Sequence, residues 1–450
     1  MDNLPGALPG PARPKILLIS LFHPELMRGG AQQVCYELFQ GLKQRGDCDV
    51  TLLASTDSSY PALFKAGAQI TGFDGRPGEF LYLMQDYDYW WHKTSSVRNI
   101  DSLIEFFETI NPDVIHFHHF FTYGADVITL ARRVLPNARI VFTFHEFMSI
   151  CAANGQMVRL TDRSLCTHAS VVRCHQCFPD RSPEQFLTRR MWYQSHLEHV
   201  DVFTCPSRFM IDIYVRWGLA RDKIRQVTNG QRRYGNPGPL RPGLKARFGF
   251  FGQFVDNKGI HILLRAVSQL RAEGFTSFTV DLNGSNIRHA SPPIRAEIEA
   301  FLAAEAALPL DQQLVFDNGS YHVDELESRM ARVDWCVVPS IWWEIFGLVI
   351  SEAWMFGKPV ICSNVGGPAE RVEHEVNGLQ FQMGDHRALA QALRRAATEE
   401  GLWERLAAGL PQPPSRERMV DGFVALYAGA EPDPAAQPVG HQPAGAMQPS

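Results

Sequence analysis

The sequence has no hydrophobic run long enough to cross a membrane and no excess of positive charge. A transmembrane helix needs about 20 consecutive apolar residues, so we expect no membrane-spanning segment. The net charge of -5 at pH 7 gives no reason to expect nucleic acid as a partner. The start of the chain lacks the charged region of a signal peptide, and its first apolar run, Ile16 to Phe22, is too short for one. We therefore expect a cytoplasmic location, with peripheral contact at the inner face of a membrane left open.

The chain is long enough for two domains, each with its own core. It has 450 residues, of which 45% are hydrophobic and 20% charged, as is usual for globular proteins. Strand-like and helix-like segments alternate along both halves, and such alternation predicts parallel sheets with helices on both faces. The expected fold class is therefore α/β, with two doubly wound, Rossmann-like domains that face each other across a cleft.

The expected elements follow from apolar runs and from helical periodicity. The expected strands are residues 16–22, 50–54, 114–118, 139–144, 202–205, 224–228, 247–254, 278–283, 313–317, 335–339, 359–363 and 379–381. The expected helices include residues 33–44, 102–110, 259–273, 294–307, 323–333, 387–401 and 416–428.

Composition also divides the chain. A Gly/Pro/Arg-rich stretch marks a connector between the halves, and the end of the chain is rich in Pro, Ala, Gln and Gly. The expected parts are a flexible N-terminus at 1–14, an N-terminal domain at 15–235 with a cysteine-bearing insertion at 151–177, a linker at 236–245, a C-terminal domain at 246–413, a helix at 414–430 that crosses back to the N-terminal domain, and a disordered tail at 431–450.

Two glutamates, Glu344 and Glu352, are the most informative residues of the second half. They stand eight positions apart, which is close to two helical turns, so the spacing predicts that they share one face. Glu344 is expected in a strand-to-helix turn, continued by Ile345 to Leu348, whose free N–H groups can bind an anion, and Glu352 is expected on the helix from Leu348 to Phe356. Two carboxylates on either side of such a turn suit a ligand with hydroxyls at both ends and a diphosphate between them. A nucleotide sugar is such a ligand.

Other candidate residues follow predicted strands. The pair Gly29-Gly30 lies before a helix, where glycines let the backbone approach a phosphate, although a plain loop is the commoner explanation. Lys258 lies at the start of another helix and can present its ammonium group to phosphate oxygens. His145 follows a buried strand. At such a position, a histidine that contacts a ligand and a histidine with a purely structural role are about equally frequent. In Asp86-Tyr87-Asp88, with no strand leading into it, we expect a surface or acceptor-facing segment rather than a metal site.

Four of the nine cysteines are grouped, at Cys151, Cys166, Cys174 and Cys177. In a reducing compartment grouped cysteines suggest a structural zinc site, but their spacing is irregular. Unliganded thiols and a redox pair therefore stay open as alternatives. A metal at His116, His118 and His119 is disfavoured, because strand alternation sends neighbouring side chains to opposite faces.

The motifs together resemble retaining glycosyltransferases of the GT-B fold in the large family-4 group, over nearly the whole chain. The strongest part is Val338-Pro-Ser-Ile-Trp-Trp-Glu344-Ile-Phe-Gly-Leu-Val-Ile-Ser-Glu352-Ala, followed by Gly357-Lys-Pro-Val-Ile and Val365-Gly-Gly-Pro-Ala-Glu370. The segment from Phe144-His-Glu-Phe to Cys174-His-Gln-Cys177 resembles a subgroup with a four-cysteine insertion.

The resemblance implies a role for each matched residue. Glu352 would hold the ribose hydroxyls, and Glu344 and His145 would contact the transferred sugar. The diphosphate would be held by Gly29, Gly30 and Lys258, together with the amides of Phe346, Gly347, Leu348 and Val349. The family commonly has a basic residue where this chain has Gln253, so a substitute cation is needed, with Arg232 and Arg233 as candidates, unless backbone donors suffice. The loop from Asn318 to Tyr321 matches the family's base-facing loop.

The implied activity is transfer of a sugar from a UDP-, GDP- or ADP-linked donor to a glycan or lipid-linked acceptor, with retention of configuration and no required cofactor. Helix N-termini and Lys258 can stabilise the leaving diphosphate without a metal. The segments Phe80–Trp91 and Arg189–Tyr193 are expected to meet the acceptor, because they lie in the half that usually does so in this fold. A sugar-nucleotide epimerase and a non-catalytic nucleotide-sugar-binding protein are the alternatives, and Gln253 is the best support for the latter.

Overall fold

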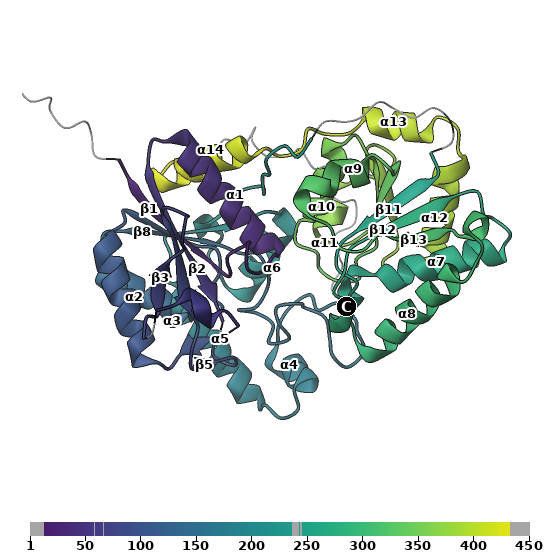
Figure 1. The fold of residues 1–450 in the computed structure, drawn as a ribbon. Coiled ribbons are helices and arrows are strands. Elements are labelled where there is room, and N and C mark those ends of the chain that lie inside the picture. The colour runs from purple at the N-terminus through teal and green to yellow at the C-terminus, as the bar shows by residue number, and fades with distance from the viewer. Residues whose placement is uncertain (1–12, 58, 66, 236–242, 244, 433–450) are drawn as a thin grey trace, which may run out of the picture.

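The computed structural model describes residues 13–432 except residues 58, 66, 236–242 and 244. Most of the expected flexible N-terminus, of the linker and of the disordered tail therefore lies outside the described residues. The described chain forms two α/β domains, which lie side by side in Figure 1 with the N-terminal domain at the left and the C-terminal domain at the right.

The strands are β1 (Lys15–Ser20), β2 (Asp49–Thr56), β3 (Ile70–Gly72), β4 (Glu79–Leu83), β5 (Tyr87–Asp88), β6 (Lys93–Thr94), β7 (Val114–Phe117), β8 (Arg139–Thr143), β9 (Val202–Cys205), β10 (Ile224–Gln226), β11 (Arg247–Phe251), β12 (Thr279–Asn283), β13 (Val315–Asp317), β14 (Trp335–Val338), β15 (Val360–Ser363) and β16 (Gly378–Phe381). The α-helices are α1 (Gly30–Arg45), α2 (Val97–Ile110), α3 (Asp126–Val134), α4 (Val171–Cys177), α5 (Pro183–Leu197), α6 (Arg208–Trp217), α7 (Ile260–Ala272), α8 (Pro292–Ala306), α9 (Leu326–Met330), α10 (Leu348–Met355), α11 (Gly366–Arg371), α12 (His386–Thr398), α13 (Leu402–Ala408) and α14 (Arg416–Tyr427). Short 3-10 turns are η1 (Pro61–Leu63), η2 (Arg221–Lys223), η3 (Asp256–Lys258), η4 (Ile287–His289), η5 (Leu310–Gln312) and η6 (Val323–Glu325).

Each domain contains one main sheet. The N-terminal sheet has the strand order β10-β9-β8-β7-β1-β2-β4-β3, and its pairs are parallel except β3–β4. The C-terminal sheet has the order β13-β12-β11-β14-β15-β16 and is parallel throughout. Strand order reverses between β7 and β1 in the first sheet and between β11 and β14 in the second. In doubly wound sheets ligands bind beyond the carboxyl ends of the strands at such a reversal.

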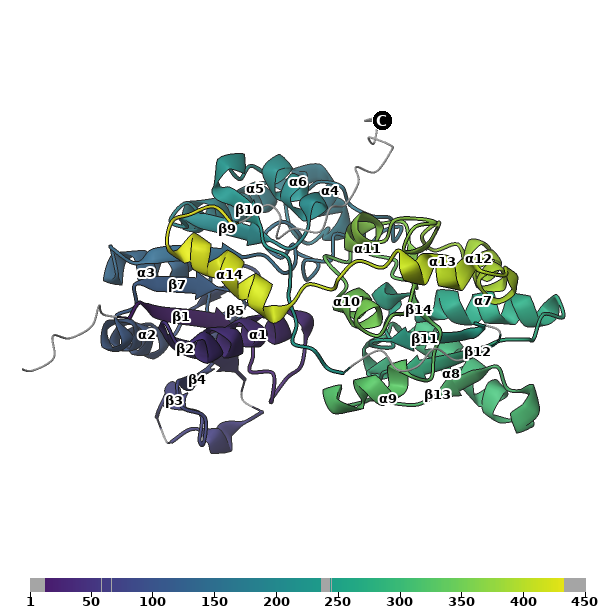
Figure 2. The same ribbon diagram turned by 90° about the horizontal axis from the view of Figure 1, so that it is seen from above.

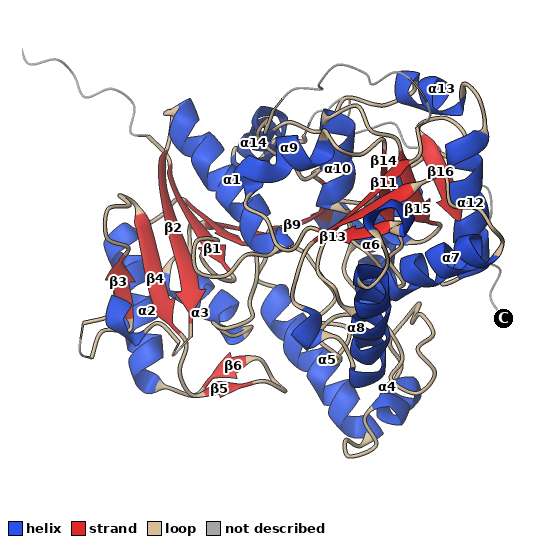
Figure 3. Ribbon diagram, turned by 45° about the vertical axis from the view of Figure 1, so that its right-hand side comes forward, coloured by secondary structure: helices blue, strands red, loops and turns tan. Residues whose placement is uncertain are grey.

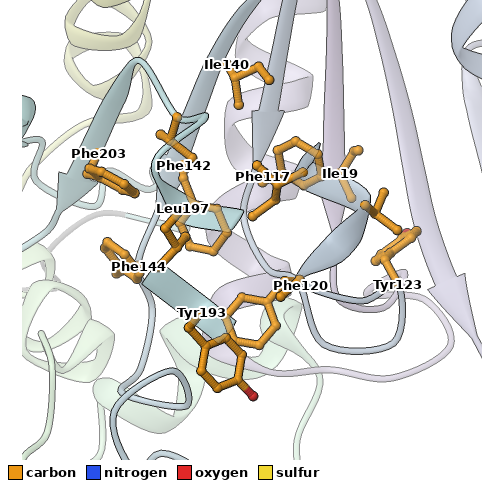
Figure 4. Close-up of a cluster of buried hydrophobic side chains, with 14 of the residues drawn as sticks. Ile19, Phe117, Phe120, Tyr123, Ile140, Phe142, Phe144, Tyr193, Leu197 and Phe203 are labelled. Atoms are coloured by element: carbon orange, nitrogen blue, oxygen red, sulfur yellow. The ribbon is translucent and has the colours of Figure 1, made fainter. Parts of the chain in front are cut away.

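Helices lie on both sides of each sheet, as Figure 3 shows. The strands at the sheet centres are buried along nearly their whole length, which explains why they read as short continuous apolar runs. One face of the N-terminal sheet is covered by a large aromatic core, part of which appears in Figure 4 with Phe117, Phe142, Phe144 and Phe203 among its members. The expected α/β class with two doubly wound domains is therefore confirmed.

Helix α14 belongs to the N-terminal domain although it ends the described chain. Figures 1 and 2 show it in yellow beside α1, after a segment that returns from α13. Its apolar side chains Met419, Val420 and Phe423 share a buried cluster with residues of α1. Arg416 pairs with the buried Glu37 of α1, with 2.5 Å between Nη2 and Oε2. Glu37 also accepts a hydrogen bond from the backbone N–H of Arg232, so α1, α14 and the segment between the domains meet at one carboxylate.

Some elements differ from the sequence expectations. All the expected strands are present, with ends that differ by up to three residues, but β3, β4 and the two-residue strands β5 and β6 were not expected. The expectation that no strand leads into Asp86-Tyr87-Asp88 is wrong, because β4 ends at Leu83. The apolar run of β4 merges with the aromatic stretch that follows it, which hides the strand in the sequence. Within the expected insertion the structure contains α4, and α5 follows directly.

Candidate functional site

A cavity of about 770 Å³ lies between the two domains and is lined by residues of both. The predicted site residues that line it are Gly29, Gly30, His145, Gln253, Lys258, Glu344, Phe346, Gly347 and Leu348. A smaller cavity of about 230 Å³ is lined by the remaining two, Val349 and Glu352, and shares Gly30, Lys258 and Glu344 with the first. The structure therefore brings all the predicted donor-site residues to two adjoining cavities.

The C-terminal side of the site is built at the reversal of strand order. The segment after β11 carries Gln253 and Lys258, and the segment after β14 carries Glu344. These two segments touch, because the N–H of Ile341 donates to the carbonyl of Asn257 at 2.9 Å. A Cβ atom on Gly259 would lie 1.8 Å from the carbonyl oxygen of Pro339, and its φ is +69°. Glycine is thus required for this close approach.

The Glu344 carboxylate accepts three hydrogen bonds at one oxygen. Lys258 Nζ lies 2.5 Å from Oε2, and Trp342 Nε1 and Ser340 Oγ lie 3.1 and 3.4 Å from it. The Glu344 side chain is 13% exposed and that of Lys258 is 31% exposed. Oε1 accepts none of these bonds, and Lys258 has capacity for two further donations. The ion pair therefore retains hydrogen-bonding capacity on both members.

The loop that carries Glu344 is fixed from both domains. Its neighbours Trp343 and Ile345 are buried in the same hydrophobic cluster as the N-terminal aromatic core. On the C-terminal side, the N–H of Gly367 donates to the carbonyl of Glu344 at 2.7 Å. A Cβ atom at Gly366, where φ is +62°, would lie 2.6 Å from that carbonyl oxygen. The carboxylate position thus depends on contacts with both domains.

The expected positions of the two glutamates, one in the turn and one on the helix, agree with the structure, but the helical repeat is not what aligns them. Helix α10 begins at Leu348, so Glu352 lies on the helix and Glu344 precedes it. Gly347 has φ +73° and ψ 77°, a left-handed conformation that separates the loop from the helix. Both carboxylates nevertheless line the smaller cavity. They meet through the loop geometry and not through helical periodicity.

Arg371 fixes the turn between the glutamates, and the sequence patterns did not indicate it. Its guanidinium donates to the carbonyls of Phe346 and Gly347 at 3.1 and 2.9 Å and to Ser351 Oγ at 2.7 Å. It also lies over the Phe346 ring, 3.8 Å from the centroid. These bonds fix the turn, and the first N–H groups of α10, which have no partner within a helix, are available to an anion. In the sequence, Arg371 was marked only by its position five residues after Gly366.

Glu352 lies in a buried environment that opens to the smaller cavity. Gln231 Nε2 donates to its Oε1 at 3.1 Å. Burial raises the pKa of Glu352, and the bond from Gln231 offsets part of that rise. Residues Asn318 to Tyr321 line neither cavity, but Tyr321 packs edge-on against Phe251, which lines the smaller one. Their expected contact with a nucleotide base stays a prediction.

The N-terminal side of the site follows β1 and β8. Gly29 and Gly30 lie where α1 begins, and a Cβ atom on Gly30 would lie 3.7 Å from Leu348 Cδ1. The two helix N-termini, of α1 and α10, thus face the same space. His145 Nε2 lies 3.0 Å from Nδ1 of the buried His118. Burial lowers the pKa of His145 to about 3, so its ring is neutral near pH 7.

The neighbouring histidines form a buried polar network. His116 bonds to Tyr427 Oη and to Thr143 Oγ1, both at 2.7 Å. His119 Nε2 lies 3.3 Å from Glu146 Oε1, and burial raises the pKa of Glu146 to about 8. No group of three or more His, Cys, Asp or Glu side chains among the described residues is arranged to hold a metal ion.

Two residues of the cysteine-bearing insertion, Gln156 and Arg163, also line the large cavity, and no sequence pattern indicated either. The candidates Arg232 and Arg233 line neither cavity. Arg232 lies over the Tyr234 ring instead, 5.3 Å from its centroid. Neither arginine therefore takes the place of the basic residue that the family commonly has at position 253.

All nine cysteines are free thiols, and the four grouped ones are half-buried. Cys151, Cys166, Cys174 and Cys177 are neighbours, since thiols of this group contribute to the raised pKa of the first three, and structural zinc at them stays a prediction. Burial raises the pKa of Cys174 to about 11 and also raises the pKa of Cys151 and Cys166. Raised thiol pKa values disfavour a reactive redox pair at neutral pH.

The expected acceptor segments lie together in the N-terminal domain. Trp192 Nε1 donates to the carbonyl of Trp91 at 2.8 Å, and Arg189 Nε donates to the carbonyl of Trp90 at 3.3 Å. Asp88 accepts from the backbone N–H groups of Trp90 and Trp91, which gives it a structural role in this turn. In the described part of the chain, no helix combines the length and the apolar character that spanning a membrane would require.

Two family models match the chain, one in each half. The model described as Glycosyltransferase Family 4 matches residues 28–231, and the model described as Glycosyl transferases group 1 matches residues 245–399.

Curated relatives carry glycosyltransferase names. An uncharacterised glycosyltransferase of Methanocaldococcus jannaschii is 25% identical over 245 residues, which cover 52% of this chain and 59% of that protein. A putative glycosyltransferase of Bacillus subtilis is 23% identical over 62% of this chain and 63% of its own length. A D-inositol 3-phosphate glycosyltransferase of Nocardioides is 32% identical over 36% of each chain. The chain thus matches less than two thirds of the length of each of these relatives.

Solved structures support the fold. The structure of Anabaena HepE in complex with UDP and glucose has a TM-score of 0.63 and 16% identity, over 92% of this chain and 99% of that chain. Sucrose-phosphate synthase of Thermosynechococcus elongatus has a TM-score of 0.63 and 21% identity, over 93% and 99%. The chain therefore has the GT-B fold and carries a glycosyltransferase family 4 domain followed by a glycosyltransferase group 1 domain.

Proposed function

We propose that the protein is a retaining glycosyltransferase that moves a hexosyl-type sugar from a nucleotide-sugar donor to a glycan or lipid-linked acceptor. One observation carries this proposal: Glu344, Lys258, the N-terminus of α10 and Gly29-Gly30 meet at one cavity between the two domains. The glycosyltransferase names of the matched families and relatives support the reaction class. The complex of HepE with UDP and glucose supports a nucleotide-sugar donor by analogy.

The donor fits the two cavities in a definite direction. The nucleoside occupies the smaller cavity, where the buried carboxylate of Glu352 accepts hydrogen bonds from ribose hydroxyls. The diphosphate lies at the N-termini of α1 and α10, near Lys258. The sugar lies in the larger cavity, between Glu344 and the neutral ring of His145. These contacts select neither the base nor the sugar, so UDP, GDP and ADP donors all belong to the test.

The site favours departure of the diphosphate. The bond between the anomeric carbon and the diphosphate oxygen breaks, and a bond forms between that carbon and the acceptor hydroxyl oxygen on the same face. The hydroxyl proton passes to the leaving phosphate oxygen, so no separate base is required. Lys258 and the N–H groups of α10 stabilise the developing negative charge. The reaction as proposed requires no metal, because these groups supply the positive potential.

The acceptor approaches from the N-terminal domain. The segment around Trp90 and Trp91 carries aromatic rings, which suit stacking against a sugar chain, whereas Arg189 is buried and donates to backbone carbonyls. We extend the proposal to a role in glycan or polysaccharide biosynthesis in the cytoplasm or at the inner face of a membrane.

Donor turnover tests the proposal directly. The purified protein is incubated with a panel of UDP-, GDP- and ADP-sugars, and release of nucleoside diphosphate is measured with and without candidate acceptors. We expect release that increases with the acceptor. Glu344→Gln should reduce it at least 100-fold, because the variant loses charge next to the reacting sugar, and should change nucleoside diphosphate affinity little. Glu404→Gln, on the exposed side of α13, is the matched control.

The same assay separates the alternatives. Conversion of one nucleotide sugar into its epimer without release of diphosphate would support an epimerase. Tight binding of nucleotide sugars without any turnover would support a non-catalytic binding protein. A product whose anomeric configuration is inverted would contradict the retaining mechanism.

A further inference from the structure

The large cavity contains little positive charge for a site that binds a diphosphate. Among the lysine and arginine side chains that the structure describes, Lys258 and Arg163 are those that line it. Lys258 is ion-paired with Glu344 at 2.5 Å, and position 253 carries the uncharged Gln253. A diphosphate carries two negative charges or more near pH 7, so a second cation is needed unless neutral donors replace it.

Arg163 reaches the cavity from the tip of a short hairpin in the cysteine-bearing insertion. Val158 and Leu165 form an antiparallel bridge. The N–H of Cys166 donates to the carbonyl of Met157 at 2.7 Å, and Ser164 donates through both its N–H and its hydroxyl to Asp162. We call residues 157–166 the cysteine hairpin. Its internal hydrogen bonds define the position of the Arg163 backbone.

The cysteine hairpin is attached to both domains. Leu165 and Cys166 pack against the aromatic core of the N-terminal domain. The carbonyl of Cys166 accepts from Trp343 Nε1 at 2.8 Å, and Trp343 is the residue immediately before Glu344. The hairpin therefore lies beside the Glu344 loop, and its arginine comes from the opposite domain to Lys258.

The present partner of Arg163 holds it only weakly. Its Nη2 lies 3.7 Å from Asp256 Oδ2, and its side chain is 52% exposed. Asp256 is already engaged, because it accepts from the N–H of Ser291 at 2.8 Å and from its hydroxyl at 2.6 Å. Exposed ion pairs of this kind contribute about 0–1 kcal/mol. Arg163 can therefore exchange this contact for a stronger one with a phosphate, to which a guanidinium can donate two parallel hydrogen bonds.

We propose that Arg163 supplies the second cation for the donor diphosphate, in place of a basic residue at position 253. This inference rests on the proposed function, since it assigns a ligand group in the same site. Lys258 then binds the diphosphate from the C-terminal domain and Arg163 binds it from the N-terminal domain. Donor binding consequently draws the cysteine hairpin and the C-terminal domain together, which excludes water from the reacting sugar.

Binding measurements on nucleosides with and without phosphates test this assignment. Calorimetry compares the nucleoside diphosphate of the preferred donor with the corresponding nucleoside, for the full-length protein and for Arg163→Gln. We expect the variant to bind the diphosphate about tenfold more weakly, the size of a lost charge-assisted hydrogen bond, and to bind the nucleoside within about twofold of the original protein. The double variant Arg163→Gln with Gln253→Arg should regain most of the lost affinity. Arg173→Gln, in the same insertion but away from the cavity lining, is the control and should change neither affinity.

The outcomes separate this inference from the proposed function. If the original protein binds no nucleoside diphosphate and turns over no nucleotide sugar, the proposed function itself fails. If it binds the diphosphate and Arg163→Gln binds equally well, only the inference is overturned. A rise in the KM for the acceptor with unchanged diphosphate affinity would likewise overturn it and assign Arg163 to the acceptor. A matching loss of nucleoside affinity would overturn it too, because it would indicate a disturbed hairpin.

Discussion

Glu352 illustrates how a single carboxylate can recognise a neutral ligand. It is half-buried, and its Oε2 has no hydrogen-bond donor among those described for this side chain, while Oε1 accepts from Gln231. An ionised carboxyl in a buried place is costly unless hydrogen bonds stabilise it. Ribose hydroxyls would supply these bonds, so the carboxylate gains most when a nucleoside is bound.

We predict that Glu352→Gln weakens binding of the nucleoside about tenfold, because the charged acceptor of the ribose hydroxyls is lost. The original protein should bind a nucleotide that lacks the ribose 3′-hydroxyl more weakly than the normal nucleotide. The variant should bind the two nucleotides with equal affinity. Since burial raises the pKa of Glu352, affinity should also fall as the pH is lowered and the carboxylate becomes protonated. Calorimetry at several pH values checks both effects, and equal losses for both nucleotides in the variant would contradict the assigned role.

His145 depends on its buried neighbour. His118 Nε2 has no hydrogen-bond partner among the described residues, whereas its Nδ1 faces His145 Nε2. An unpaired buried N–H is less tolerable than an unpaired acceptor, so His118 carries its proton on Nδ1 and donates it to His145. His145 then carries its own proton on Nδ1 and can offer an N–H to a sugar hydroxyl.

We predict that turnover shows no ionisation of His145 between pH 6.5 and 9, because burial lowers its pKa to about 3 and the ring stays neutral. The pH–rate profile of the original protein and of His145→Gln should have the same shape, although the variant should be slower. A rate-determining group with a pKa near 6.5 that disappears in His145→Gln would contradict this prediction.

The turn between β14 and α10 shows how an element prepares an anion site. Gly347 adopts a left-handed conformation, and Arg371 binds the carbonyls on the other side of the turn. The free N–H groups of a helix then face the ligand with the positive end of the helix dipole. In the proposed function, Arg371 therefore acts on the donor through the backbone that it fixes.

We predict that Arg371→Met lowers the free energy of unfolding of the C-terminal domain by about 3 kcal/mol, because buried carbonyls lose a charged donor. It should also weaken nucleoside diphosphate binding about tenfold. Denaturant unfolding and calorimetry check these values, with Arg387→Met on the exposed face of α12 as the control. Unchanged affinity in Arg371→Met would contradict the role assigned to this turn.

The four cysteines of the insertion can be either free thiols or zinc ligands. The four grouped cysteines form no disulfide, and burial raises the pKa of Cys151, Cys166 and Cys174. Zinc at these residues stays a prediction that would require the four sulfur atoms to converge.

We predict that the four half-buried cysteines are alkylated in the native protein at a rate that rises with pH, since the thiolate is the reacting form. The remaining five are buried and should react only after unfolding. Mass spectrometry of labelled protein checks this pattern. About one zinc per chain in elemental analysis, together with thiols that react only after a chelator is added, would instead establish the zinc site.

At the scale of the whole molecule, the two domains differ in their buried titratable groups. Burial lowers the pKa of one described histidine of the C-terminal domain, His261, and of six in the N-terminal domain: His92, His116, His118, His119, His145 and His196. Two carboxyls of the same domain have raised pKa values, Asp126 at about 6 and Glu146 at about 8. Because the histidines outnumber these two carboxyls, the histidines determine how the stability of the N-terminal domain changes on acidification.

We predict that the N-terminal domain loses stability before the C-terminal domain on acidification. A histidine with a lowered pKa binds its proton more readily in the unfolded chain, so its contribution is complete above about pH 6.5 and is lost as the pH falls, at up to about 1.4 kcal/mol per pH unit. Asp126 and Glu146 act in the opposite direction, because their raised pKa values mean that the native protein binds these protons more tightly than the unfolded chain does. Hydrogen exchange at pH 7.5, 6.5 and 5.5 resolves the domains, and His196→Gln should reduce the pH dependence. Equal protection of the N-terminal domain at pH 7.5 and 5.5 would contradict the prediction.

The sequence by itself determined the parallel sheets and most strands, because a buried parallel strand is encoded by a local apolar run such as Val202–Cys205. It also indicated the candidate residues from Gly29 to Glu352 that the structure brings to the two cavities, since residues that follow the strands collect at one edge of a doubly wound sheet, but it did not indicate Gln156 or Arg163. Strand β4 was missed because its short apolar run merges with the aromatic stretch that follows.

Only the tertiary structure decided how these pieces meet. The approach of Arg163 to the cavity, the anchoring of the turn by Arg371 and the contact of His118 with His145 join residues that are distant along the chain or lie in separate elements. Glu344 and Glu352 meet through a left-handed glycine and not through the helical repeat. Such contacts depend on loop geometry and on the packing of one domain against the other, which no local pattern of residues encodes.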